Sequence, residues 1–221
     1  MKQSFYLFLL FQLLFVSVHT LLTGERNLLF AHISRGKALE EKRLVPIPDT
    51  KGKSKKQFFL DQGLHYFNLK KFHLAIDDLS VAILIDPYFS MAYVHRGWAH
   101  LTLGNVVNAM LDFNRAIALK DTSSKAYSGR GVAYLQLRFF EKALVDLEKA
   151  IEMDAKNHNN YNFKAKALSE LGKYDKALLS LERAKELNPG NAFASHLSPY
   201  VKIRLKMYTE AIDAFFNAVL S

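Results

Sequence analysis

Histidine and carboxylate side chains are the groups in this sequence that could bind a metal ion or transfer protons. Eight histidines are present, but none has a His-Glu-x-x-His or paired Cys/His spacing. His95 and His100 are five residues apart, which places them on different faces of a helix. Asp77-Asp78 and Glu40-Glu41 are adjacent carboxylates, and adjacent side chains on a helix diverge. We therefore expect no metal site and no carboxylate pair that acts on one substrate.

Nucleophilic chemistry is equally unsupported. The chain contains no cysteine, which excludes disulfides, thiolate metal ligands and thiol nucleophiles. It also lacks a Gly-rich phosphate loop, a Gly-x-Ser-x-Gly motif and the kinase motifs. We predict a protein that is not an enzyme and that holds no cofactor.

Two arginines and two aspartates recur at one interval and could bind phosphate or each other. Arg96 and Arg130 are 34 residues apart, and so are Asp112 and Asp146. One hypothesis is a structural ladder, in which Arg96 pairs with Asp112 or Asp78 and Arg130 pairs with Asp146 or Asp112. The alternative is a phosphate-binding arginine pair. We favour the ladder, because the carboxylates recur in step with the guanidinium groups.

The interval of 34 residues also spaces small and aromatic residues, which must position any site. Alanine recurs in two series, Ala75, Ala109, Ala143, Ala177 and Ala211, and Ala82, Ala116, Ala150, Ala184 and Ala218. Gly63, Gly97, Gly131 and Ala165 form a third series, and Phe59, Tyr93, Tyr127 and Tyr161 a fourth. Small side chains allow two helices to cross closely, and aromatic side chains fill wider gaps. The pattern predicts helix pairs that stack in sequence order.

These series resemble the tetratricopeptide repeat (TPR). The resemblance covers the units 56–89, 90–123, 124–157 and 158–191 and a shortened unit 192–221, so the TPR domain spans residues 57–221. It implies an all-α fold, a right-handed α-solenoid of antiparallel helix pairs. Breaks within the pairs are expected at Lys70-Lys71, Gly104-Asn105, Arg138 and Gly172-Lys173. Breaks between units are expected at Asp86-Pro87, Asp121-Thr122 and Asn188-Pro189-Gly190.

The last unit departs from the pattern. Pro199 replaces the small residue of the other units, and proline inside a helix costs about 3 kcal/mol. We expect either a kink or a late helix start with Ser198 as the N-cap. The chain then ends in a helix from Thr209 to Leu220. Because Phe216 stands where earlier units have polar residues, Phe216 and Val219 are a candidate docking edge; packing of Phe216 against its own unit is the alternative.

The N-terminal region has a different composition. An apolar run from Phe5 to Leu22 follows Lys2, so residues 1–24 are predicted to be a signal peptide or a membrane anchor, with both alternatives open. Residues 25–43 could form a helix before a basic linker at 51–56. Residues 25–56 contain nine Lys/Arg and four Asp/Glu, which favours a solvated linker over lipid contact, and no nucleic-acid binding is expected. The chain is expected to be exported or membrane-anchored, with a bacterial envelope weakly favoured.

The TPR resemblance also implies a binding surface, because the first helix of each unit lines the concave face. The predicted groove residues are Leu60, Leu64, Phe67, Met91, Val94, Trp98, Leu101, Val132 and Leu135. We predict a non-catalytic scaffold that binds an apolar or aromatic segment of a protein there, unless residues 28–39 fill the groove themselves. The alternative is a structural subunit that self-assembles through its C-terminal helical edge in a membrane-associated complex, as a homo-oligomer.

Some TPR domains clamp the acidic C-terminus of heat-shock chaperones with asparagines that follow the glycine position. In this sequence, Leu64, Trp98 and Val132 occupy those positions. The resemblance therefore does not extend to that clamp, and we expect a different ligand.

Overall fold

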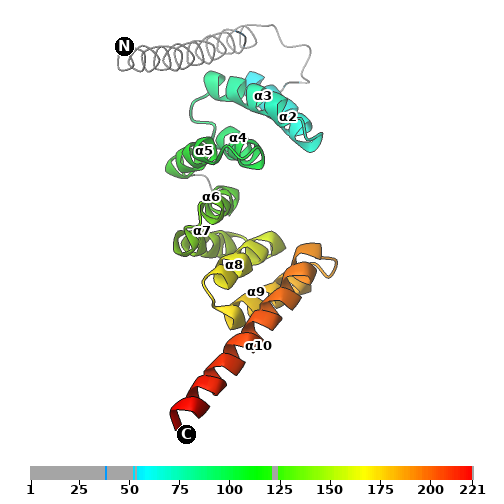
Figure 1. Ribbon diagram of the computed structural model, residues 1–221. Coiled ribbons are helices and arrows are strands. Elements are labelled where there is room, and N and C mark those ends of the chain that lie inside the picture. Colours follow the sequence, from blue (N-terminus) through cyan, green and yellow to red (C-terminus); the bar gives the residue numbers. More distant parts are fainter. Residues whose placement is uncertain (1–37, 39–51, 53, 121–123, 221) are drawn as a thin grey trace, which may run out of the picture. The chain divides into compact units, whose positions relative to one another are not determined.

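The computed structural model describes residues 38, 52, 54–120 and 124–220. The chain divides into two units, residues 1–55 and 56–221, and the helices belong to the second unit apart from the first residue of α2. Between Lys55 and Leu220 the described residues form nine α-helices and no strand. These are α2 (Lys55–Asn68), α3 (Phe72–Ile85), α4 (Ser90–Thr102), α5 (Val106–Ala118), α6 (Ser124–Gln136), α7 (Phe140–Met153), α8 (His158–Glu170), α9 (Tyr174–Leu187) and α10 (Ala192–Leu220) (Figure 1).

Helices α2 to α9 form four pairs, and each pair packs on the next through α3 and α4, α5 and α6, and α7 and α8. Within the first pair, a Cβ atom added at Gly63 would lie 2.7 Å from Leu79 Cγ. The alanine series of the second helices is fully buried at Ala75, Ala109, Ala143 and Ala177 and at Ala82, Ala116, Ala150 and Ala184. The predicted all-α solenoid of helix pairs is confirmed.

Each pair turns at the same place in its unit. The residue at position 15, counted from Lys56, Ser90, Ser124 or His158, has a positive φ in all four pairs: 58° at Lys70, 76° at Gly104, 62° at Arg138 and 72° at Gly172. The predicted breaks within the pairs are therefore confirmed, as are those at Asp86-Pro87 and Asn188-Pro189-Gly190. The predicted break at Asp121-Thr122 lies outside the described residues.

The second unit has a larger core side chain than its neighbours. Phe113 is fully buried where the other units have leucine. A Cβ atom at Gly97 would lie 2.8 Å from the ring of Phe113, and one at Gly129 would overlap that ring. Gly129 is not part of any series in the sequence. It compensates across the unit boundary for the volume of Phe113.

The fifth unit forms one helix of 29 residues, α10, with Pro199 inside it. Asn191 Oδ1 accepts a hydrogen bond from the N–H of Ala194 at 3.2 Å, as an N-cap does. The expected late start at Pro199 is therefore wrong, and Ser198 Oγ instead donates to the carbonyl of Ala194 at 2.7 Å. The predicted helix from Thr209 to Leu220 is the continuation of the same helix.

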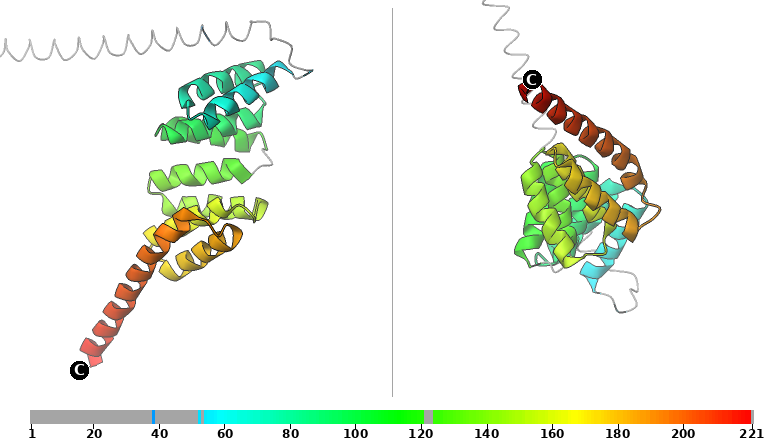
Figure 2. Two further views of the ribbon diagram at one scale, coloured as in Figure 1. Left: turned by 90° about the vertical axis from the view of Figure 1, so that its right-hand side faces the viewer. Right: turned by 90° about the horizontal axis from the view of Figure 1, so that it is seen from below.

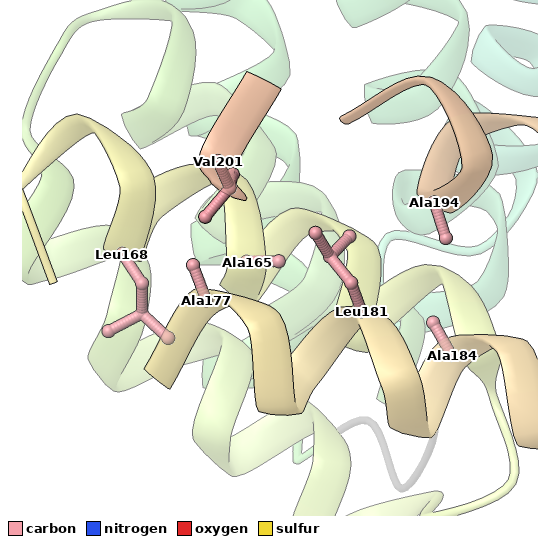
Figure 3. Packing of buried hydrophobic residues seen from close by; sticks show 7 residues of the cluster. All are labelled: Ala165, Leu168, Ala177, Leu181, Ala184, Ala194 and Val201. Atoms are coloured by element: carbon pink, nitrogen blue, oxygen red, sulfur yellow. The ribbon is translucent and has the colours of Figure 1, made fainter. Parts of the chain in front are cut away.

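Only the first part of α10 is packed into the solenoid. Ala194 and Val201 join Ala165 and Leu168 of α8 and Ala177, Leu181 and Ala184 of α9 in one buried cluster (Figure 3). Beyond Val201, α10 runs on past α9 (Figures 1 and 2). We call residues 202–220 the outer half of α10.

None of the helices formed by described residues is long and apolar enough to span a membrane. The segment predicted to target a membrane, residues 1–24, lies outside the described residues. Residues 25–43 also lie outside the described residues, apart from Ala38.

Candidate peptide-binding groove

The first helices of consecutive units lie next to one another, since α4 contacts α6, α6 contacts α8 and α8 contacts α10. In the second, third and fourth units, the side chains at positions 5 and 12 are buried between these helices, and so is Leu60 at position 5 of the first unit. Four of the nine predicted groove residues are buried there: Leu60, Val94, Leu101 and Leu135. These four residues belong to the core of the solenoid, so fewer of the predicted groove residues are accessible to a ligand than the sequence indicated.

The other predicted groove residues reach the surface. Met91 is exposed, and Leu64, Phe67, Trp98 and Val132 are partly exposed. Position 9 of the five units holds Leu64, Trp98, Val132, Lys166 and Tyr200, which we call the groove row. Trp98 is held in place on both sides, since its ring packs edge-on against Phe113 at 5.8 Å and its Nε1 donates to the carbonyl of Lys125 at 3.3 Å. A fixed, partly exposed indole is a typical interface anchor.

Polar residues in the C-terminal half of the same face mostly hold the units together. Ser128 Oγ donates to Asn160 Oδ1 at 2.7 Å. Asn162 and Asn191 exchange two amide hydrogen bonds of 3.1 and 3.0 Å. All four side chains are buried. Because these hydrogen bonds are made within the chain and the side chains are buried, they offer little to a ligand. Asn160 Nδ2 is buried and has no hydrogen-bond partner among the described residues.

A pocket of about 350 Å³ lies between α8 and α10, and we call it the terminal pocket. Its lining is Lys166, Ser169, Glu170, Phe193, His196, Leu197 and Tyr200. Phe193 and Tyr200 are 39% and 54% exposed. Neither is among the predicted groove residues, although they follow Asn159 and Lys166 by 34 residues and could have been found by extending positions 2 and 9 into the fifth unit.

A second pocket, of about 440 Å³, lies at the N-terminal end of α4 and includes Met91, Lys120 and Lys125 in its lining. At its rim, Lys56 Nζ and an Asp86 carboxylate oxygen are 2.6 Å apart. The hydrogen bond from Lys56, together with that from the N–H of Tyr88, lowers the pKa of Asp86 below its usual value. The lysines beyond this pair give the pocket a basic edge.

The arginine–aspartate ladder is confirmed, with each pair inside one unit. Arg96 donates from Nη2 and Nε to the two carboxylate oxygens of Asp112 at 2.7 and 2.9 Å. Arg130 does the same with Asp146 at 2.8 and 2.7 Å, and this hydrogen bonding raises the pKa of Arg130. The remaining Nη1 groups donate to Ser80 and Asn114. We call these bidentate pairs the Arg–Asp ties, and their geometry favours a structural role.

The fourth unit lacks this tie. Lys164 pairs with Glu148 at 2.8 Å, and Ser180 Oγ donates to the carbonyl of Lys176 at 3.0 Å. A pocket of about 500 Å³ opens there, lined by Lys164, Ser180 and neighbouring residues of α7 and α9. The shorter side chains leave unfilled the space that arginine and aspartate occupy in the two preceding units.

Two further predictions concern the C-terminal docking edge and metal binding. The side chains of Phe216 and Val219 lie outside the described part of the chain, so the docking edge stays a prediction. Among the residues that the structure describes, no three His, Asp or Glu side chains form a metal-binding group.

Comparisons with known proteins agree with this geometry. A family model described as "Anaphase-promoting complex, cyclosome, subunit 3" matches residues 136–218. No curated protein sequence gives a match. The crystal structure of MamA protein is 21% identical with a TM-score of 0.60, and the match covers 75% of this chain and 90% of that chain.

Two other solved structures extend the comparison. The APC/C hetero-tetramer Cut9-Hcn1 is 17% identical with a TM-score of 0.63, over 67% of this chain and 30% of that chain. The first TPR of Spaghetti (RPAP3), bound to the HSP90 peptide SRMEEVD, is 31% identical with a TM-score of 0.52, over 53% of this chain and 96% of that chain. With the buried alanine series and the repeated turns, these similarities establish that the chain belongs to the tetratricopeptide-repeat family.

Proposed function

We propose that this chain is a non-catalytic scaffold that binds a segment of another protein along the first helices of its units. One observation carries the proposal: the groove row is apolar except for Lys166 and leads into the terminal pocket, where Phe193 and Tyr200 are exposed. Apolar surface of this kind, gathered in a hollow, is typical of a binding site.

The chemistry of the row favours an apolar or aromatic ligand segment. The Spaghetti domain is bound to an HSP90 peptide, which supports peptide binding as the general activity. Leu64, Trp98 and Val132 offer that acidic peptide no hydrogen-bond donors of the clamp type. Lys125, exposed beside the row, and Lys166, exposed within it, would suit an acidic residue flanking the apolar anchors.

The proposal can be tested with peptides selected on the immobilised chain from a random library. A selected peptide should bind Trp98→Ala and Tyr200→Ala at least about tenfold more weakly than the wild-type chain, as expected for interface anchors. Val107→Ala is the matched control, because Val107 on α5 is 72% exposed and belongs to neither the groove row nor a lined pocket. Unchanged affinity in both groove variants would rule out this surface.

The groove could instead be filled by residues 28–39 of the same chain. In that case the full-length chain should select no peptide, while a chain that starts at residue 51 should. Equal binding by both lengths would favour an external ligand.

We further propose that residues 1–24 direct the chain to a membrane, as a cleaved signal or as an anchor. The support is the apolar run from Phe5 to Leu22 after Lys2. Fusion of residues 1–24 to alkaline phosphatase, which is active only after export, should give activity in bacterial cells. The double substitution Leu9→Arg and Leu13→Arg should abolish that activity, and an inactive wild-type fusion would refute export.

A second candidate function is self-assembly through the C-terminal helical edge. The observation that favours it is the outer half of α10, in which Tyr208 is 58% and Ile212 38% exposed although both continue the buried face of the helix. The two functions are compatible, since they use different surfaces.

A further inference from the structure

The pocket at the missing Arg–Asp tie, which we call the fourth-unit pocket, has a volume of about 500 Å³. That volume lies within the range of small-molecule sites, roughly 300 to 1,000 Å³. Residues of α7, α8 and α9 line the pocket, and none of them belongs to the groove row or to the terminal pocket. A ligand in it would therefore occupy a surface separate from the proposed peptide groove.

The equivalent positions of the third unit hold groups that satisfy one another. Arg130 and Asp146, at positions 7 and 23, form the bidentate tie. Tyr134 and Phe139, at positions 11 and 16, pack edge-on with their ring centres 6.4 Å apart. Lys142 at position 19 places its Nζ 5.9 and 5.3 Å from the centres of these two rings. Each charged group at these positions thus has a partner within the chain.

The fourth unit replaces four of these five residues. Lys164 stands in place of the arginine, Ser180 of the aspartate, Leu168 of the tyrosine and Lys173 of the phenylalanine, while Lys176 keeps the lysine. All five line the fourth-unit pocket. The carboxylate and both rings are therefore lost together, whereas the number of basic side chains rises from two to three.

The charges of the lining do not balance. Lys164 Nζ lies 2.8 Å from a carboxylate oxygen of Glu148, the acidic residue of the lining. Lys173 and Lys176 are exposed, and neither forms an ion pair with another residue that the structure describes. Three lysines and one glutamate leave two positive charges, which an anionic ligand would balance.

The remainder of the lining is aliphatic and favours a particular kind of anion. Leu168 is 4% exposed and Leu179 66% exposed, and Leu144 is partly exposed. Leucine side chains favour a hydrocarbon stem beside the charged group. Position 23 holds an aspartate in each of the first three units, so the anion that ordinarily occupies this place in the fold is a carboxylate.

We propose that the fourth-unit pocket binds an aliphatic carboxylate supplied from outside the chain, either a glutamate side chain of a partner protein or a free dicarboxylic acid. The carboxylate replaces the aspartate that is missing from position 23. Lys173 and Lys176 bind it, and its stem packs on the leucines. The site does not depend on the peptide groove, so either can fail without the other.

Titration of the full-length chain with glutarate, followed by NMR of the backbone amides, tests the proposal. Glutarate should shift the amide signals of the lining, such as those of Leu168 and Ser180, in a saturable way. Glutaramide has the same carbon chain without the charges and should leave these signals in place. Equal shifts with both compounds, or glutarate shifts spread evenly over the exposed lysines, would overturn the proposal.

Two matched pairs of substitutions separate this site from a general attraction of anions to a basic chain. Lys173→Gln with Lys176→Gln should weaken glutarate binding at least about tenfold. Lys156→Gln with Lys202→Gln removes the same charge from exposed positions outside the lining and should change the affinity by less than about twofold. Equal weakening by the two pairs would contradict a specific pocket.

Two further variants should act in opposite directions. Glu148→Gln should strengthen glutarate binding, because it removes a negative charge and frees Lys164. Ser180→Asp supplies the carboxylate from within the chain, as the first three units do, and should abolish glutarate binding while circular dichroism shows an intact fold. Weaker binding by Glu148→Gln, or undiminished binding by a folded Ser180→Asp chain, would overturn the proposal.

A short peptide with one acidic residue, acetyl-Gly-Glu-Gly-amide, separates the two sources of the carboxylate. Similar affinities for this peptide and for glutarate would assign the pocket to an acidic side chain of a partner protein. Binding of glutarate alone would assign it to a free dicarboxylic acid. Binding of neither compound would overturn the proposal and leave the peptide groove untouched.

Discussion

The first unit and the last unit have similar turn sequences but different structures. Position 14 is leucine and position 15 is lysine in both, as Leu69-Lys70 and Leu205-Lys206. In the first unit the chain reverses at Lys70, whose φ is 58°, and α3 packs back on α2. In the last unit the helix continues through Lys206 to Leu220. The turn sequence therefore does not decide whether a unit folds back.

The difference lies in the surface that each first helix offers. In α2, Phe59 and Gly63 are buried and face the second helix. In α10, the equivalent Ser195 and Pro199 are exposed. Because a short helix gains most of its stability from packing its apolar side, a second helix folds back only where the first presents small and apolar residues. The following substitutions test this difference.

The largest expected effect comes from removing a contact between the two helices of the first unit. Leu79 is fully buried against Gly63, so Leu79→Ala should lower the free energy of unfolding by about 3 kcal/mol. Ile203→Ala in α10, at a 60% exposed position, should cost about 0.5 kcal/mol or less. Urea denaturation followed by circular dichroism measures both. Equal losses would mean that α10 is packed as tightly as the folded pairs.

The Arg–Asp ties provide the next largest effect. Asp146→Ala leaves the half-buried guanidinium of Arg130 without its bidentate partner, which should cost about 2 kcal/mol. Ser180→Ala, at the same position of the fourth unit, removes one hydrogen bond to a backbone carbonyl and should cost about 0.5 kcal/mol. A cost of Ser180→Ala as large as that of Asp146→Ala would contradict a special role for the tie.

The sequence predicted the fold of α2 to α9 well, because steric rules act at single positions. Alanine at positions 20 and 27 and a turn at position 15 are local requirements that repeat. The continuity of α10 could not be predicted in the same way. It depends on the absence of small and apolar residues from the face of α10 on which a second helix would pack. Likewise, the match between Phe113 and Gly129 exists only once two units are stacked.

The exposure of the predicted groove residues could be foreseen only in part, for a related reason. The groove residues implied by the resemblance fall at positions 2, 5, 9 and 12 of the units. Neighbouring first helices approach closely enough to bury positions 5 and 12, as Leu60 and Leu101 show. The exposed aromatic residues of the terminal pocket, Phe193 and Tyr200, belong to the fifth unit, which Pro199 made look irregular.

A smaller effect concerns glycine at position 15, which should stabilise a folded pair but destabilise α10. Gly172 has a φ of 72° with open space around it, so Gly172→Ala should cost about 1 kcal/mol through backbone strain. Lys206 occupies the same position but lies inside a helix, so Lys206→Gly should weaken α10 by about 1 kcal/mol. Hydrogen exchange of the amides around residue 206 measures the second effect. If Lys206→Gly slowed this exchange, α10 would not be a continuous helix in solution.

The smallest effect is a pH dependence at the junction between the first two pairs, where Lys56 of α2 holds Asp86 before α4. The hydrogen bond from Lys56 lowers the pKa of Asp86 in the folded chain, so the pair stabilises the fold above the unfolded-state pKa of about 3.9. That stabilisation is lost as the pH falls through the lower folded-state value. Asp86→Asn and Lys56→Met should therefore each reduce the difference in urea midpoint between neutral pH and about pH 3. Because α10 has no folded-back helix, the last unit has no junction of this kind. A pH dependence that both variants leave intact would have to arise elsewhere in the solenoid.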